Sequence, residues 1–167
     1  GLGGLAVLRE MKWALPEEDV LYLGDTARRP YGPQPVESVR SYAVEITGFL
    51  VSRGVKAVII GCNTASVAGA DAARRCFPAI PVLDMVAPGV KAAVDSTQRG
   101  RIAVWGTTLT IEKQAYDRAI LDVSPSAEVR GVACPELLRL AEKGEIDDRI
   151  RLTTLARRYF EPIRDFG

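Results

Sequence analysis

Apolar residues recur along the chain in two alternating patterns, one typical of helices and one typical of strands. Helical spacing, with apolar side chains returning every three or four residues, covers residues 3–14, 36–53, 64–76, 88–96, 111–121, 136–143 and 147–159. Short continuous apolar runs, typical of strands, cover residues 19–23, 55–60, 80–83, 102–105 and 127–132. Alternating strands and helices predict βα units, and therefore an α/β fold with a mainly parallel sheet.

The segment Gln98-Arg99-Gly100 separates two such series of elements and is the best candidate linker. A chain of 167 residues is long enough for one ordinary domain or two small ones. We therefore expect two α/β lobes, the first over residues 1–98 and the second over residues 99–167, each of them incomplete.

The composition indicates a soluble globular protein, with 47% hydrophobic and 26% charged residues. The net charge is +1 and no basic stripe is visible, so nucleic acid is not an expected partner. No apolar run approaches the roughly 20 residues that a membrane span needs. The first residues lack a basic region followed by an apolar one, so no signal peptide is expected.

Three cysteines, Cys62, Cys76 and Cys134, lie far apart, which argues against a disulfide framework and for a reducing compartment such as the cytoplasm. The chain has no histidine, the commonest general base and metal ligand. The spacing of thiols and carboxylates suggests no metal site. Proton chemistry must therefore come from Cys, Asp, Glu, Lys or Tyr.

In open α/β sheets, ligands bind beyond the carboxyl ends of the strands. Three such ends, residues 24–26, 61–64 and 106–108, each begin with glycine, which lets a backbone come close to a ligand. Cys62 would lie at a helix N-terminus, where the helix dipole stabilises a thiolate. Thr64 would cap this helix or, with Asn63, hold a carboxylate. The alternative is an inert buried cysteine beside a helix cap.

The other candidate residues each have a structural alternative. Tyr31 and Gly32, in a proline-rich loop, would cover a ligand or form a rigid turn. Thr107 and Thr110 would both reach one small anion, or one of them would cap the following helix. Glu142 reads most simply as a surface carboxylate. Cys76 and Cys134 are expected to serve packing.

Several of these segments together resemble the glutamate racemases of the cofactor-independent aspartate/glutamate racemase family. Residues 24–32 match the family's G-D-T-A-R-x-P-Y-G, and residues 62–65 match its C-N-T-A. Weaker matches are residues 1–5 with the end of D-S-G-x-G-G-L, residues 106–110 with G-T-x-x-T, and residues 133–135 with A-C-P, followed by Glu142.

The resemblance implies two flavodoxin-like lobes with the active site between them. It also implies that two cysteine thiols interconvert L- and D-glutamate without a cofactor, and that the D-glutamate supplies peptidoglycan synthesis. Cys62 would be one of these thiols. Glutamate, the small-molecule partner, would be held by Tyr31, Gly32, Asn63 and Thr64, with Thr107 and Thr110 as further contacts and Glu142 in support. A homodimer stays open.

Two family features are not in this chain: the Asp-Ser pair expected before Gly1 and the second thiol in a C-T-H motif. We therefore expect a piece truncated at both ends, inactive by itself. Asp84 stands where a small residue is expected. Two alternatives remain, namely a racemase of aspartate or another amino acid, and a non-catalytic α/β module that binds a small anion.

Overall fold

The structure is a computed structural model that describes residues 3–145 and 147–166, without the side chain of Glu142. Contacts divide the chain into two compact units, with the division between Met85 and Val86. The first two residues of the glycine-rich opening lie outside the described residues. Each unit is described by itself below.

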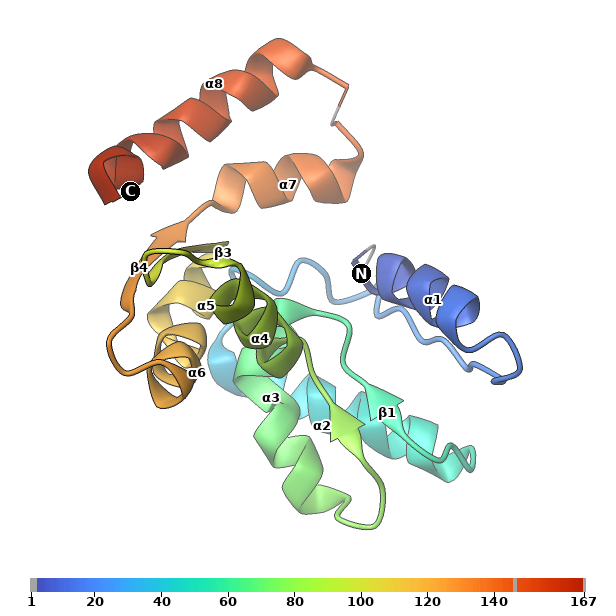
Figure 1. The fold of residues 1–167 in the computed structure, drawn as a ribbon. Helices are drawn as coiled ribbons and strands as arrows, with labels where there is room; N and C mark the ends of the chain where they lie inside the picture. The colour runs from blue at the N-terminus through green and yellow to red at the C-terminus, as the bar shows by residue number, and fades with distance from the viewer. Residues whose placement is uncertain (1–2, 146, 167) are drawn as a thin grey trace. The chain divides into compact units, whose positions relative to one another are not determined.

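The first unit contains two parallel strands and three helices (Figure 1). Strands β1 and β2 pair in parallel, with Val58 opposite Val82. These two residues and Ala73 form a small buried core. The elements in chain order are α1 (Gly3–Ala14), α2 (Val36–Ser52), β1 (Val58–Ile59), α3 (Asn63–Cys76) and β2 (Val82–Leu83).

Helices α2 and α3 make the most extensive contact in this unit, because α3 presents small residues to α2. A Cβ built on Gly69 would lie only 2.5 Å from the Cβ of Ala43 in α2. Real Cβ atoms do not approach so closely, so glycine at position 69 is what allows the two helices to pack at this distance. Their packing fixes α3, and with it the residues at both of its ends.

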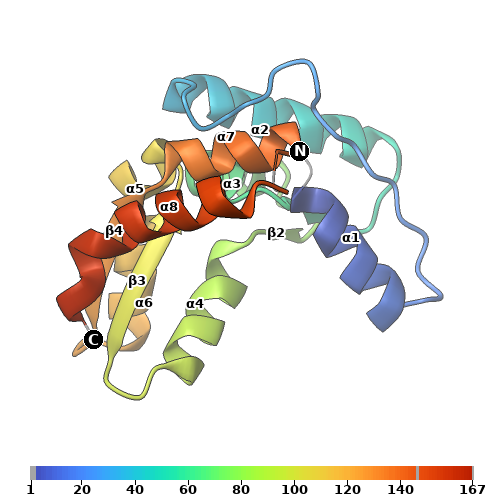
Figure 2. The same ribbon diagram turned by 90° about the horizontal axis from the view of Figure 1, so that it is seen from above.

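The second unit contains two longer parallel strands and the remaining helices (Figure 2). Strands β3 and β4 pair in parallel over six residues each, with Ile102 opposite Val129. Its elements are α4 (Val86–Ser96), β3 (Arg101–Gly106), α5 (Thr108–Glu112), α6 (Ala115–Val123), β4 (Glu128–Ala133), α7 (Pro135–Lys143), α8 (Arg149–Phe160) and the 3₁₀ helix η1 (Glu161–Phe166).

The α/β class with parallel strand pairing is confirmed, and most predicted helices begin and end within two residues of their predicted bounds. The predicted strand over residues 19–23 is wrong: within the described residues this run has no regular secondary structure and belongs to no sheet, and Leu21 is 48% exposed. The predicted helix over 111–121 is also wrong, since it divides into α5 and α6. Gln114 breaks it by adopting the left-handed conformation, with φ of 49°.

The contacts of helix α4 assign it to the second unit, although the sequence predicts it in the first lobe. Its buried Val90 packs with Ile102, Ile120 and Ala127. The lobe boundary after residue 98 stays a prediction. Among the described residues, no helix combines the length and apolar character that crossing a bilayer demands.

Candidate active site

Cys62 occupies the position that the sequence predicts for it, between a strand and a helix. It is the N-cap residue of α3, with an extended backbone (φ −132°, ψ 120°), and two residues, Ile60 and Gly61, separate it from β1. Its thiol is free and half-buried. Its carbonyl accepts a hydrogen bond of 2.8 Å from the N–H of Ser66, which begins the helix. The thiol therefore lies at the positive end of the α3 dipole, while its catalytic role stays a prediction.

Asn63 and Thr64 are the first two residues of α3. Asn63 is exposed, whereas Thr64 is only 4% exposed. The prediction that Thr64 caps the helix is wrong, because Cys62 takes the N-cap position, and its side chain forms no capping hydrogen bond. Contact of either residue with a substrate stays a prediction.

The loop before α2 is organised around Asp25, which sequence reasoning did not place in the site. Arg28 Nε donates to Asp25 Oδ2 at 2.7 Å, and the Tyr31 hydroxyl donates to the same oxygen at 2.5 Å. The Asp25 side chain is 9% exposed. The spacing itself was the available signal, because an acid followed three and six residues later by donors can form this fork within one loop.

Arg28 is held by the protein on three sides. Besides Asp25, its guanidinium bonds Glu45 at 2.6 Å and lies 4.2 Å from the centre of the Tyr42 ring. The hydrogen bonds to Glu45 and Asp25 raise the pKa of Arg28 against a lowering by burial. Since two carboxylates balance this cation, its role in the structure is to fix the loop.

Tyr31 remains protonated at neutral pH. Burial is the largest cause that raises its pKa, and the hydrogen bond to Asp25 and the Asp25 charge raise it further. A negative charge on Cys62 raises the same pKa, so the phenol and the thiol are close enough to interact electrostatically. Gly32, next to Tyr31, is buried. The structure thus brings Tyr31 and Cys62 into one neighbourhood of the first unit.

Thr107 and Thr110 lie together in the second unit. Thr107 is the N-cap of α5, and its hydroxyl accepts the Thr110 N–H at 3.1 Å. The two hydroxyls are 2.9 Å apart, and both residues are buried. The sequence left two alternatives open, and the structure shows the second of them, because Thr107 caps α5. A contact with an anion stays a prediction.

The two remaining cysteines differ from each other. Cys134 is 5% exposed, its Sγ donates to the Val132 carbonyl at 3.3 Å, and burial raises its pKa. These properties suit a packing residue. The packing prediction for Cys76 is wrong, because this residue is exposed. It is the last residue of α3, three residues beyond Ala73, which enters the buried core of the first unit.

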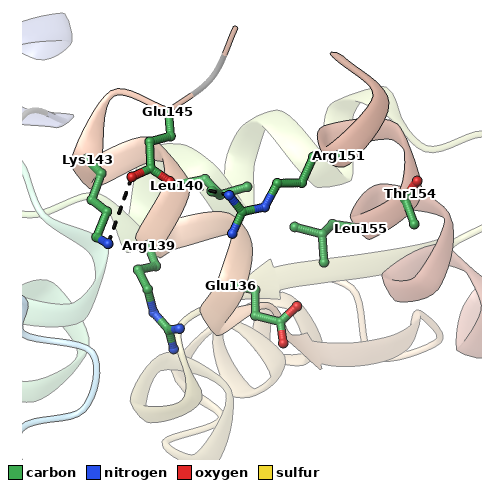
Figure 3. Close-up of a pocket in the computed structure, with 8 residues that line it drawn as sticks. All are labelled: Glu136, Arg139, Leu140, Lys143, Glu145, Arg151, Thr154 and Leu155. Atoms are coloured by element: carbon green, nitrogen blue, oxygen red, sulfur yellow. Dashed lines mark hydrogen bonds and ion pairs between the residues drawn. The ribbon is translucent and has the colours of Figure 1, made fainter. Parts of the chain in front are cut away.

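A cavity of about 480 Å³ lies between α7 and α8 (Figure 3). Its charged groups largely pair with one another: Glu145 bonds Arg151 at 3.4 Å and approaches Lys143 at 3.9 Å. None of the predicted site residues lines it, and the side chain of Glu142 lies outside the described residues. In the described part of the chain, no three His, Cys, Asp or Glu residues gather as a metal site would require.

Residues 3–159 match the family model described as "Asp/Glu/Hydantoin racemase". The chain belongs to this family. A glutamate racemase from Geobacter metallireducens is 43% identical over all 167 residues of this chain, which cover 61% of that protein. One from Beutenbergia cavernae is 43% identical, with all of this chain covering 57% of it.

Solved structures of family members share the fold. The glutamate racemase of Francisella tularensis, described as a complex with D-glutamate, matches all of this chain with a TM-score of 0.93 and 33% identity. The RacE1 isoform from Bacillus anthracis matches 98% of the chain with a TM-score of 0.92 and 36% identity. The chain spans about three fifths of the length of these family members.

Proposed function

We propose that this chain is a part of a glutamate racemase, namely most of its first lobe and part of its second lobe. Such an enzyme interconverts L- and D-glutamate without a cofactor, using two thiols. The proposal draws support from relatives named glutamate racemase at 43% identity, and from a related structure described with D-glutamate bound. We refer below to a protein that extends this chain to the length of its relatives as the full-length protein.

The position of Cys62 is the observation that carries the proposal. Inverting an α-carbon requires a base on one face and an acid on the other. A half-buried thiol at the N-terminus of α3 is suited to be one of these groups, because the helix dipole favours its thiolate. By the family resemblance, we assign the second group to the C-terminal part of a family member, which this chain does not span.

The neighbouring residues supply what a carbanion next to a carboxylate needs. Negative charge developing on the carboxylate oxygens is stabilised by hydrogen-bond donors aimed at them. We assign this role to Asn63 and Thr64, which begin α3 directly after the thiol. Tyr31 and Gly32 contribute from the loop that Asp25 organises.

The remaining roles follow from the family resemblance. In this proposal Thr107 and Thr110 contribute further substrate contacts, and Glu142 has a supporting role. The enzyme works in the cytoplasm, where its D-glutamate supplies peptidoglycan synthesis and thereby cell wall and cell shape. It has no nucleic-acid partner, and a homodimer is the assembly to test for.

Racemisation in deuterated water tests the proposal. The full-length protein is incubated with each enantiomer of glutamate and of aspartate, and the products are separated by chiral chromatography and weighed by mass spectrometry. We expect inversion of glutamate with uptake of deuterium at the α-carbon, and much slower inversion of aspartate. Preferred inversion of aspartate would reassign the substrate, and inversion of neither acid would refute the proposal.

The chain of residues 1–167 provides the matched comparison. Because it contributes one thiol at one face of the substrate, it is expected to exchange the α-proton slowly with retained configuration, and not to invert it. Sustained inversion by this chain, abolished by Cys62→Ala, would show that the second acid lies within these residues and that the two-thiol assignment is wrong.

A further inference from the structure

Ser66, one turn into α3, joins three segments of the first unit. Its N–H donates to the Cys62 carbonyl at 2.8 Å. Its hydroxyl donates to the Ile60 carbonyl at 3.2 Å and accepts the Met85 N–H at 3.2 Å. The residue is 5% exposed. One buried side chain therefore connects the segment after β1, the segment after β2 and the first turn of α3.

These bonds differ from the usual behaviour of a serine inside a helix. A helical serine commonly donates to the carbonyl three or four residues earlier in its own helix, as Ser52 does to Phe49 at 2.7 Å. For Ser66 the carbonyl four residues earlier is that of Cys62, which accepts the Ser66 N–H as in a regular helix. The hydroxyl instead reaches Ile60, outside the helix. Its hydroxyl therefore holds the backbone on either side of Cys62, the segment after β1 and the first turn of α3.

The two partners of the hydroxyl are themselves fixed. Ile60 donates its N–H to the Leu83 carbonyl at 2.9 Å, so the segment after β1 is tied to β2. Near Met85, Arg74 Nε donates to the Val82 carbonyl at 2.9 Å, and its guanidinium forms an ion pair with Asp84. This pair also gives Asp84 a structural role. Ser66 thus connects Cys62 to anchored backbone on two sides.

We propose that Ser66 is a positioning residue for Cys62, and this inference rests on the proposed role of that thiol in proton transfer. Only Gly61 separates Ile60 from Cys62, so holding Ile60 on one side and the helix on the other fixes the direction of the thiol. Proton transfer depends steeply on geometry, and a displacement of about 1 Å can cost about 100-fold in rate.

The test compares three variants of the full-length protein: Ser66→Ala, which removes the hydroxyl, Ser66→Thr, which retains it, and Ser52→Ala as a matched control. We expect Ser66→Ala to lower kcat for glutamate by about 10- to 100-fold with little change in KM, because the thiol is displaced while the substrate contacts remain. Ser66→Thr should recover most of the rate. Ser52→Ala should behave as the unaltered protein.

Alkylation of the three cysteines gives a readout that is independent of activity. In Ser66→Ala, Cys62 should react several-fold more slowly relative to Cys76, because its thiol no longer lies against the helix N-terminus. The buried Cys134 reports on global unfolding, which would speed up its alkylation. An unchanged kcat and an unchanged Cys62 rate in folded Ser66→Ala would overturn the inference.

Two further outcomes are also decisive. If Ser66→Ala speeds up the alkylation of Cys134, that variant is unfolded and Ser66→Thr decides. A normal kcat and a normal Cys62 alkylation rate in Ser66→Thr support positioning by the hydroxyl. A lower kcat and a slower Cys62 rate in a folded Ser66→Thr protein contradict it. If the unaltered full-length protein does not racemise glutamate, the proposed function fails, whereas the Cys62 alkylation rates still decide whether Ser66 positions the thiol.

Discussion

The two ends of α3 each carry a cysteine, and their surroundings are opposite. Cys62 at the N-terminal end is half-buried and lies beside a serine that is tied to backbone beyond both strands. Cys76 at the C-terminal end is exposed and is the last residue of the helix. The helix dipole favours an anion at the first position and disfavours it at the second. One helix therefore places the same functional group in two different surroundings, so comparing the two thiols separates the effect of position on the helix from the effect of exposure.

Removing each thiol in turn gives the largest expected difference between the two ends. In the full-length protein, Cys62→Ala should lower kcat for glutamate by about 100- to 10,000-fold, since a general base contributes about 10²–10⁴ in rate. Cys76→Ala should leave kcat unchanged. The measurement is the initial rate of inversion in both directions. Equal losses in the two variants would contradict the contrast between the ends.

A second test asks whether the packing of α3 against α2 holds both ends in place. Gly69→Ala forces a Cβ to within 2.5 Å of the Ala43 Cβ. Overpacking costs about 1–3 kcal/mol, and the better helix propensity of alanine returns up to about 1 kcal/mol. We expect the free energy of unfolding to fall by roughly 1–2 kcal/mol net, measured by urea denaturation.

Gly48→Ala in α2 is the matched control for this packing test. It gains the same helix propensity, but its new Cβ would meet the ring tip of Phe77 at 3.0 Å, and a ring tip can move. Its free energy of unfolding should stay close to that of the unaltered chain. A stable Gly69→Ala variant would show that the helices separate without cost.

The sequence predicted the order of elements well. Each helix or strand buries one side against the core, so its apolar residues recur with the period of that element. It did not predict the break at Gln114, since a left-handed residue inside an apolar pattern leaves that pattern intact. The predicted strand over residues 19–23 failed for a different reason. A strand exists only with a hydrogen-bonded neighbour, and an apolar run does not specify one.

The candidate site shows the same limit. The position of Cys62 followed from a local signal, the transition from an apolar run to a helical pattern. The exposure of Cys76 depends on where α3 ends relative to the core, which periodicity cannot give. The fork on Asp25 and the bonds of Ser66 join residues whose proximity is created by the folding of a loop and by the pairing of β1 and β2.

Alkylation at graded pH sharpens the comparison between the thiols. We expect Cys62 to react about tenfold faster than Cys76 near neutral pH, despite its lower exposure, because a helix N-terminus stabilises the thiolate that reacts. Cys134 should react most slowly, since burial raises its pKa and restricts access. Peptide mapping by mass spectrometry measures the three rates. Cys76 or Cys134 reacting first would remove the basis for assigning Cys62 to catalysis.

The smallest expected effect concerns the phenol near the N-terminal end of α3. Because folding raises the pKa of Tyr31, through burial and then through Asp25, the folded state holds this proton more tightly than the unfolded chain does. The resulting stabilisation is fully present below the ordinary tyrosine pKa of about 10 and is lost as the pH rises above it through the folded value. Partial exposure keeps the contribution below about 1 kcal/mol.

Tyr31→Phe should therefore lower the free energy of unfolding slightly at about pH 8 and make its decline toward about pH 10.5 shallower. Urea denaturation at the two pH values measures this slope, with Tyr22→Phe as the control for losing a phenol elsewhere in the first unit. Asp25→Asn should change the slope in the same direction but by less, because it removes the charge that opposes ionisation of Tyr31 and leaves the burial of the phenol in place. An alkaline decline that is as steep in Tyr31→Phe as in the unaltered chain would show that folding does not raise the pKa of Tyr31.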